Sequence, residues 1–160
     1  VRWPGHIPAD LTTDACLNTP DIMPTLLGLM NLPIPEEVEG SDLSHCALCV
    51  DGPEPEAALL QGMGATAIFE DGHEWRALRS KQYTYAIYRS DRSECLFDNL
   101  ADPYQQRNLV DDTDHQETLN HYRELLQQRM AELNDSFELC TWYQDNWIED
   151  RIIQRTATMA

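Results

Sequence analysis

Residues 74–98, EWRALRSKQYTYAIYRSDRSECLFD, decide the fold of this chain. The run is rich in aromatic and aliphatic residues with short polar interruptions, which is typical of strands joined by tight turns. It predicts strands at Glu74–Arg79, Gln82–Arg89 and Glu94–Asp98. The link between the first two strands is so short that they must form an antiparallel hairpin, because a parallel return needs a crossover of a dozen or more residues.

A fourth strand and a long helix flank this run. Ala57–Met63 predicts the fourth strand, and Thr113 with Gln116 matches the capping box that opens a helix. Apolar residues then recur at spacings of three or four, so one stripe of the helix can pack on the sheet. The stripe consists of Leu119, Tyr122, Leu126, Met130 and Leu133. The predicted fold class is α+β, a four-stranded antiparallel sheet packed by a long C-terminal helix.

The segment before the sheet has a different character. Asp21 is placed to cap a helix at Ile22–Met30, and Pro24 falls in its first turn, where a missing N–H costs no internal bond. Apolar residues cover almost the whole circumference, so we expect a helix buried on most sides. Residues 36–56, rich in Pro, Gly and acids, predict a long surface connection. Val1–Pro4 read like a chain arriving from a buried strand, so we expect a truncated or processed start.

These patterns predict three parts, residues 1–50, 51–135 and 136–160. The second part holds the sheet and the long helix. The third part is a tail with three large aromatics, and we expect them to dock on a surface because a solvated tail seldom carries so many. These aromatics are Trp142, Tyr143 and Trp147.

Composition excludes several classes of function. The net charge of -17 repels phosphate backbones and anionic lipid surfaces, which argues against nucleic-acid and membrane-surface roles. The longest apolar run, residues 22–30, is far shorter than the roughly 20 residues that cross a bilayer. Cys46 and Cys49 form a lone C-x-x-C without the two further ligands of a zinc site. Compartment and oligomeric state do not follow from these features.

Four stretches carry a family signature. They are VRWPGHIPA (1–9), DIMPTLLGLMNLPIP with EGSDLS (21–44), EWRALRSKQYTYAIYR (74–89) and LFDNLADPYQQRNLV (96–110). In this order they resemble the C-terminal portion of the type I sulfatases, arylsulfatase-like members of the alkaline-phosphatase-like superfamily. The resemblance implies that residues 1–50 end the family's large α/β domain and that the full-length enzyme is a hydrolase of aryl or carbohydrate sulfate esters. A fragment of a related phosphonate or phosphate ester hydrolase is one alternative, and a non-enzymatic acidic interaction module is another.

The resemblance also implies a formylglycine, made from the Cys or Ser of a C-x-P-x-R or S-x-P-x-R motif, beside a calcium ion. Neither motif occurs in this chain. Asp71-Gly72-His73 differs in letter order from the family's Asp-His-Gly metal motif, and Asp111-Asp112 precedes a helix start, where acidic groups are favoured. We therefore expect no catalytic residue and no metal ligand in this chain. Calcium and formylglycine are expected upstream in the full-length enzyme, and the fragment alone is expected to be inactive.

The candidate substrate contacts are His73, Trp75 and Arg76. Five of the 11 basic residues fall between positions 76 and 92, a concentration that would attract an anion. The family's small domain resembles a wall beside the active-site cleft, where a sugar ring of a sulfated substrate would stack on Trp75 while Arg76 holds a carboxylate or second sulfate. The alternative is that Trp75 anchors the core, Arg76 pairs with a neighbouring acid and His73 is an ordinary loop residue.

Overall fold

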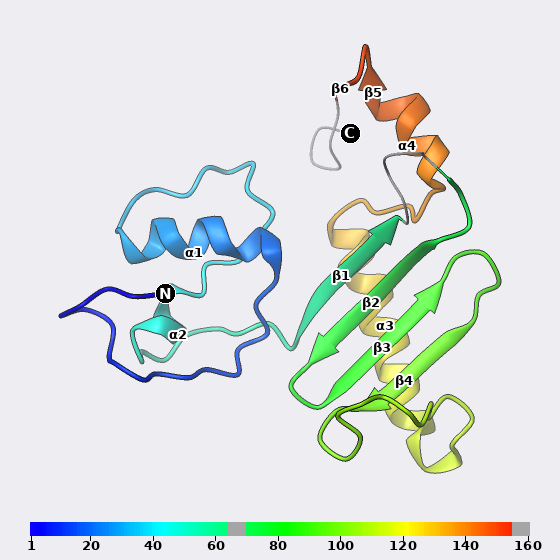
Figure 1. The fold of residues 1–160 in the computed structure, drawn as a ribbon, viewed down its shortest axis with the longest axis horizontal. Coiled ribbons are helices and arrows are strands. Elements are labelled where there is room, and N and C mark those ends of the chain that lie inside the picture. Colours follow the sequence, from blue (N-terminus) through cyan, green and yellow to red (C-terminus); the bar gives the residue numbers. More distant parts are fainter. Residues whose placement is uncertain (64–69, 155–160) are drawn as a thin grey trace. The chain divides into compact units, whose positions relative to one another are not determined.

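The predicted sheet is present in the computed structural model, which describes residues 1–63 and 70–154 (Figure 1). Its strands lie in sequence order, and neighbours run antiparallel. They are β1 (Ala57–Met63), β2 (Glu74–Ser80), β3 (Tyr83–Tyr88) and β4 (Glu94–Asp98). Every bound lies within one residue of its prediction, because short links and side-chain alternation leave the strands little freedom of register.

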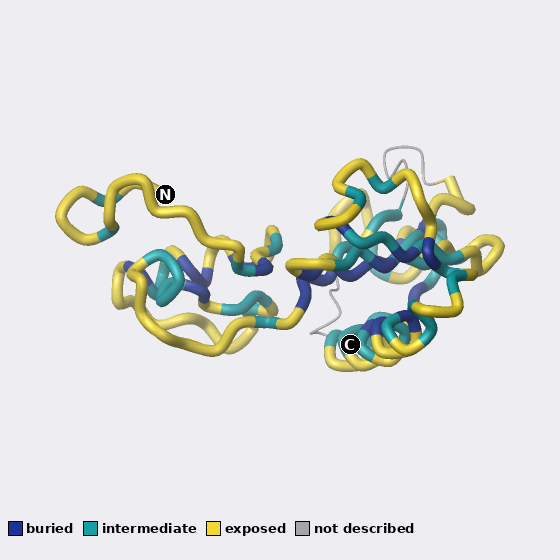
Figure 2. The backbone as a smooth tube through the Cα atoms, turned by 90° about the horizontal axis from the view of Figure 1, so that it is seen from below, coloured by how far each residue is buried: buried dark blue, intermediate teal, exposed yellow. Residues whose placement is uncertain are grey.

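The register of the strands sorts the side chains onto two faces. Leu78 of β2 lies opposite Tyr85 of β3, which lies opposite Leu96 of β4. All three side chains are buried and form the centre of the core. Figure 2 shows that the sheet strands hold much of the buried backbone of this part of the chain.

Helix α3 (Gln116–Glu132) packs against the sheet on the side of this core. Three members of the predicted stripe are buried, Leu119, Tyr122 and Leu126, and the last two, Met130 and Leu133, are half-buried. The hydroxyl groups of Tyr122 and Ser80 are hydrogen-bonded at 2.6 Å, which joins the helix to the end of β2. Burying an apolar side chain of this size stabilises the fold by about 1.5–3 kcal/mol.

The start of α3 corrects the prediction of a capping box. A short 3-10 turn, η2 (Thr113–His115), precedes the helix, and Asp112 caps it by accepting the N–H of Asp114 at 3.0 Å. The side chain of Gln116 donates to two backbone carbonyls before the helix instead of accepting from a cap residue. Asp is a stronger N-cap residue than Thr, and its charge also favours the helix N-terminus.

The outer edge of β4 is closed by the segment that follows it. The Asn108 side chain accepts the N–H of Leu96 and donates to the C=O of Glu94, both at 3.0 Å. The N–H of Leu109 donates to the C=O of Leu96 at 2.8 Å. These bonds satisfy an edge that would otherwise be free to pair with another chain.

The tail folds into helix α4 (Cys140–Trp147) and a short ladder of β5 (Ile148–Glu149) with β6 (Ile152–Ile153). Tyr143 is buried, and its hydroxyl accepts a hydrogen bond from Arg76 of β2 at 3.4 Å. The prediction that tail aromatics dock on a surface is therefore confirmed for Tyr143.

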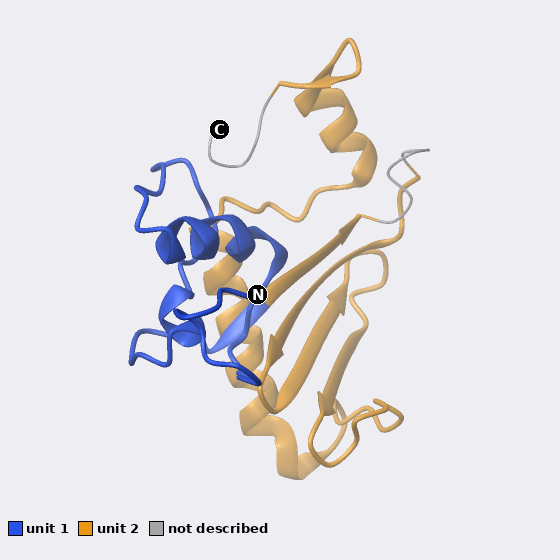
Figure 3. Cartoon of the chain, turned by 60° about the vertical axis from the view of Figure 1, so that its left-hand side comes forward, with its two compact units in different colours: residues 1–58 blue, residues 59–160 orange. Residues whose placement is uncertain are grey.

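The chain divides into two units after residue 58, inside β1, whereas the prediction placed a boundary at residue 50 (Figure 3). Unit 1 is residues 1–58 and unit 2 is residues 59–160. The predicted tail thus belongs to the unit of the sheet, and its end, residues 155–160, lies outside the described residues. None of the helices in the described part of the chain is long and apolar enough to cross a membrane.

Unit 1 contains three short elements, η1 (Thr19–Asp21), α1 (Ile22–Leu29) and α2 (Ser44–Ala47). The predicted helix is confirmed and ends one residue early, but Asp21 does not cap it. Asn18 caps η1 instead, and the Asp21 carboxylate accepts the N–H groups of Asn18 at 2.6 Å and Ser41 at 2.8 Å. This buried carboxylate ties the long connection to the start of the helix.

Much of the apolar surface of α1 stays exposed. Pro24, Thr25 and Leu29 are buried, whereas Met23 is 51% exposed. The other exposed apolar residues of the predicted helix are Ile22, Leu26 and Met30. Within the described chain the helix is therefore not buried on most sides, although a helix that is apolar all round is typical of a protein interior.

Candidate substrate-contact site

The three predicted substrate contacts lie at the start of β2, but their side chains do not converge. His73 is exposed and precedes the strand by one residue. Trp75 and Arg76 are consecutive strand residues, and alternation sends them to opposite faces of the sheet. Arg76 shares the face of the buried Leu78, so Trp75 lies on the face away from the core of α3.

Arg76 takes part in a buried ion pair with Asp135, which follows α3. Its side chain is 2% exposed, and Nε and Nη2 donate to the two carboxylate oxygens at 2.5 and 2.9 Å. Nη1 donates to the carbonyls of Gly62 and Trp75, and Nη2 also reaches the hydroxyl of Tyr143 at 3.4 Å. All five N–H donors of the guanidinium therefore have acceptors within the chain.

This ion pair holds Asp135 in its charged form. Burial raises the pKa of Asp135, but the hydrogen bonds and charge of Arg76 outweigh it, so the pKa lies below the ordinary value. The ring of Phe137 lies 4.5 Å from the guanidinium carbon and covers the pair. The arrangement matches the alternative for Arg76, pairing with an acid, and leaves it no donor for a substrate carboxylate or sulfate.

Trp75 packs against β1 on the opposite face. A Cβ atom on Gly62 would come within 2.2 Å of Trp75 Nε1, so the glycine makes room for the indole. Trp75 pairs with Tyr88 of β3, and both rings keep part of their surface in solvent. A partly exposed aromatic pair of this kind can stack on the face of a sugar ring.

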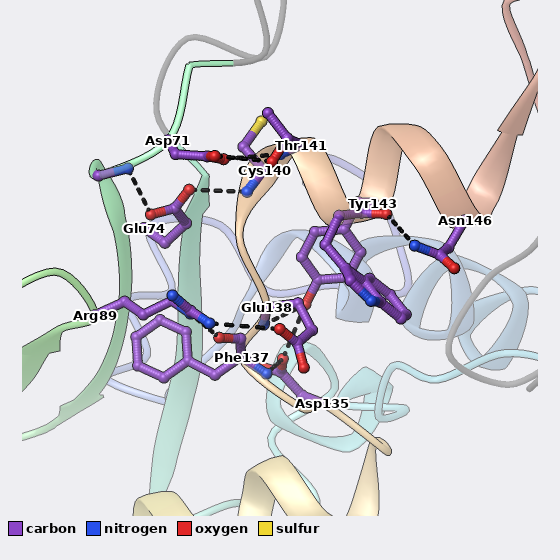
Figure 4. Close-up of polar contacts among 12 residues, drawn as sticks. Asp71, Glu74, Arg89, Asp135, Phe137, Glu138, Cys140, Thr141, Tyr143 and Asn146 are labelled. Carbon is purple, nitrogen blue, oxygen red and sulfur yellow. Dashed lines mark hydrogen bonds and ion pairs between the residues drawn. The ribbon is translucent and has the colours of Figure 1, made fainter.

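Two carboxylates on either side of His73 bind the start of α4 (Figure 4). Glu74 has no exposed surface, and its two oxygens accept the N–H groups of Cys140 at 2.8 Å and Gly72 at 2.9 Å. Asp71 accepts the N–H of Thr141 at 2.9 Å and its hydroxyl at 2.8 Å. The backbone that carries His73 is thereby attached to the tail.

The pKa values of both carboxyl groups are lowered. Burial raises the pKa of Glu74, but the N–H groups of Cys140, of Glu74 itself and of Gly72 together outweigh this effect. The pKa of Asp71 is lowered by the N–H and then the hydroxyl of Thr141. Both groups are therefore carboxylates at neutral pH and act as acceptors only.

The other basic side chains of residues 76–92 do not gather into one positive surface. Arg79 is exposed and donates to Thr84 and Asn99 at 2.8 Å each. Arg89 donates to the C=O of Phe137 at 2.5 Å and pairs with Glu138 (Figure 4). The arginines of this stretch therefore lie on both faces of the sheet, and Arg76, Arg79 and Arg89 all make contacts within the chain.

A second ion pair joins α3 to the sheet. Arg123 donates to the two oxygens of Glu94 at 2.8 and 2.5 Å, and the hydroxyl of Tyr85 also donates to Glu94. Burial, and then Glu94, raise the pKa of Tyr85 above its ordinary value. Neutral Tyr85 therefore remains a donor to this carboxylate.

The acidic residues that drew attention in the sequence are bound within the chain. Among residues 1–63 and 70–154, no three His, Cys, Asp or Glu side chains are arranged to hold a metal ion. Asp71 is bound to Thr141, and Asp112 caps η2 and pairs with Arg107 at 2.7 Å. The chain also contains neither the C-x-P-x-R nor the S-x-P-x-R motif.

Sequence reasoning missed the partners supplied by the tail. Asp135, Cys140 and Thr141 match no motif, and they lie 59 to 70 residues from the groups they bind. One signal was available: Arg76 lies between Glu74 and Leu78 on the inward face of an alternating strand, which implies a buried acid nearby.

The fold defines a class. A 2-O GAG sulfatase shares it with a TM-score of 0.65 at 22% identity, covering 73% of this chain and 25% of that one. A protein solved with its substrate D-glucosamine-2-N,6-O-disulfate has a TM-score of 0.75 at 19% identity, covering 84% of this chain and 28% of that one. A phosphonate monoester hydrolase from Silicibacter pomeroyi has a TM-score of 0.61 at 22% identity, covering 81% of this chain and 28% of that one. The fold is thus one that occurs in a sulfatase and in a phosphonate monoester hydrolase.

Sequence comparison identifies the family more narrowly than the comparison of folds. The family described as N-sulphoglucosamine sulphohydrolase, C-terminal, matches residues 1–134, and the chain belongs to this family. An ulvan-active sulfatase from Formosa agariphila is 39% identical over 89% of this chain and 28% of the relative. An endo-4-O-sulfatase from Bacteroides thetaiotaomicron is 31% identical over 95% of this chain and 32% of the relative. The chain therefore spans about a third or less of the length of these relatives.

Proposed function

We propose that this chain is the C-terminal part of a sulfatase that hydrolyses a carbohydrate sulfate ester. The observation that carries the proposal is the family match over residues 1–134. The names of both sequence relatives describe sulfatases, one of them active on the polysaccharide ulvan. An aryl sulfate or another sulfated small molecule belongs to the same reaction class.

The catalytic groups belong, in this proposal, to a part of the enzyme outside this chain. Calcium and a formylglycine are expected there. The chain itself supplies the scaffold and one wall of the cleft, with the exposed His73 and the partly exposed Trp75 facing the non-sulfated part of the substrate. Arg76 takes the role of holding β2 to the tail through Asp135.

Unit 1 is proposed to be the end of the large α/β domain. The support is the apolar surface of α1, where Met23 is 51% and Met30 is 55% exposed. So much exposed apolar area on one helix is unusual on the surface of a soluble domain and is typical of a helix that packs in a protein interior. The expected cover is the rest of that domain.

A phosphonate monoester hydrolase is the second candidate, because enzymes of that name share the fold. The two candidates differ in the ester that they cleave. A direct test is to express the full-length protein that contains this chain and to offer ulvan oligosaccharides, D-glucosamine-2-N,6-O-disulfate, p-nitrophenyl sulfate and a phenyl phosphonate monoester. Sulfate is measured by ion chromatography and phenol by absorbance.

The proposal expects sulfate release from at least one sulfated carbohydrate at a higher kcat/KM than phosphonate cleavage. Cleavage of the phosphonate ester without any sulfate release would favour the second candidate function, a phosphonate monoester hydrolase. The isolated 160-residue chain serves as the control and should release no sulfate. Sulfate release by this chain alone would show that the catalytic groups lie within it.

A further inference from the structure

The start of α4 depends on the segment that carries His73. The first N–H groups of a helix have no partner inside it, and Leu139 at the N-cap position of α4 has no side chain that can accept them. Glu74 accepts the N–H of Cys140, and Asp71 accepts the N–H of Thr141. The cap of α4 is therefore supplied by residues about 70 positions earlier in the chain.

The same bonds fix the backbone on both sides of His73. Asp71 is held from the tail by the N–H and the hydroxyl of Thr141, and Glu74 by the N–H of Cys140. Glu74 also accepts the N–H of Gly72, whose φ of +98° is a conformation that suits glycine. The backbone on both sides of the exposed His73 is therefore held by hydrogen bonds of its neighbours.

Asp135 and Tyr143 add a second anchor next to the first. Asp135 holds Arg76, the residue after Trp75, and the hydroxyl of Tyr143 lies 3.4 Å from the same guanidinium. Every tail residue in these contacts comes after residue 134, where the family match ends. These contacts with Asp71, Glu74 and Arg76 are therefore made by a part of the chain beyond the region that the family match covers.

We infer that residues 135–143 position the His73–Trp75 segment for the carbohydrate part of the substrate, with Asp71 and Thr141 as positioning residues. The inference rests on the proposed function, because it assigns His73 and Trp75 to the sugar side of the site. Beyond the proposed function, the inference states that recognition of the sugar depends on tail residues that position His73 and Trp75 without contacting the substrate.

The test uses the full-length enzyme with two substrates. Ulvan oligosaccharides present a sugar to the wall, whereas p-nitrophenyl sulfate presents the ester with no sugar. Asp71→Ala removes both bonds to Thr141, and Thr141→Val removes only the hydroxyl bond while keeping the size of the side chain. Thr141→Ser restores the hydroxyl. The matched control is Asn146→Ala, which removes a bond to the C=O of Trp142 within α4 and contacts neither carboxylate.

We expect Asp71→Ala to raise KM for the oligosaccharide about tenfold or more, with kcat/KM for p-nitrophenyl sulfate within about twofold of the wild type, where a tenfold change corresponds to about 1.4 kcal/mol. Thr141→Val should give a smaller rise, and Thr141→Ser and Asn146→Ala should match the wild type. Hydrogen exchange of the peptide containing residues 71–76 should speed up in Asp71→Ala and not in Asn146→Ala.

Two results would overturn the inference. One is an unchanged KM for the oligosaccharide in Asp71→Ala while exchange of residues 71–76 is faster. The other is an equal loss of kcat/KM on both substrates, which would mark the contact as support for the whole fold. Absence of sulfate release by the wild-type enzyme from either substrate would instead count against the proposed function, so the two failures are distinguishable.

Discussion

Replacing Asp135 with Ala should destabilise unit 2 more than any surface substitution. The change removes the two carboxylate oxygens that accept from Arg76 Nε and Nη2, and the side chains of Arg76 and Asp135 are only 2% and 5% exposed. It also removes the acceptor for the side chain of Gln61 at 2.8 Å and for the N–H of Phe137 at 2.9 Å. A buried guanidinium is left without its counter-charge.

The expected loss is about 3–5 kcal/mol, the range for breaking a buried ion pair by removing one partner. The free energy of unfolding is measured by urea titration, with tryptophan fluorescence as the signal. Trp75, one of the four tryptophans, lies next to the pair in β2, so part of the signal comes from this region of the sheet. A loss below about 1 kcal/mol, the value of an exposed pair, would refute the interpretation of a buried anchor.

A matched double variant separates charge from packing. Arg76→Met with Asp135→Leu replaces the pair by apolar side chains of similar size, and such replacements are often neutral or stabilising. We expect the double variant to be more stable than Asp135→Ala. If it is less stable, the contribution comes from the further bonds of Asp135 and not from the charge of Arg76.

The pH dependence of the pair has a definite sign. The pKa of Asp135 is lower in the folded protein than its ordinary value, so the folded state favours the carboxylate. The stability that it contributes is fully present above the unfolded pKa of about 3.9 and is lost as the pH falls through the lower folded value. The difference in unfolding free energy between wild type and Asp135→Ala should therefore shrink below about pH 4.

Three further outcomes are expected. Glu94→Gln should cost about 1.5–3 kcal/mol in urea unfolding, because it weakens the charge-assisted bonds to Arg123. A loss below roughly 0.5 kcal/mol, which is the error of such titrations, would contradict this. Gly62→Ala should displace the indole of Trp75, which lowers the free energy of unfolding by about 1–3 kcal/mol and shifts the tryptophan fluorescence maximum. An unchanged spectrum would show that the backbone of β1 moves instead of the indole. Leu119→Ala should cost about 2–5 kcal/mol by leaving a cavity between α3 and the sheet, and a loss under about 1 kcal/mol would mean that the helix is loosely packed.

The strands and the long helix could be predicted because their signals are local. Alternation along β3 and the short link to β2 leave one antiparallel solution, and the spacing from Leu119 to Leu126 repeats with the helix period. The capping prediction at Thr113 was wrong, although the helix start was close. Asp112, one residue earlier, competes for the same N–H groups and is the stronger cap.

The candidate site could be predicted only in outline. His73 is exposed and Trp75 is partly exposed, as a contact with substrate requires, and their proposed role stays a prediction. The choice between a substrate contact and an ion pair at Arg76 depends on which acid lies nearby. No local pattern around β2 identifies that acid, because Asp135 is 59 residues away.

The sequence by itself determined the strand ranges, the hairpin of β2 and β3, the covering helix and the absence of a formylglycine motif, because each is a matter of spacing between near neighbours. Only the tertiary structure decided that the tail returns to β2, that Asp135 pairs with Arg76 and that Asp71 and Glu74 cap α4. The physical reason is that a buried charge or an unpaired helix N–H requires a partner without specifying where in the chain the partner is found, and packing makes that choice.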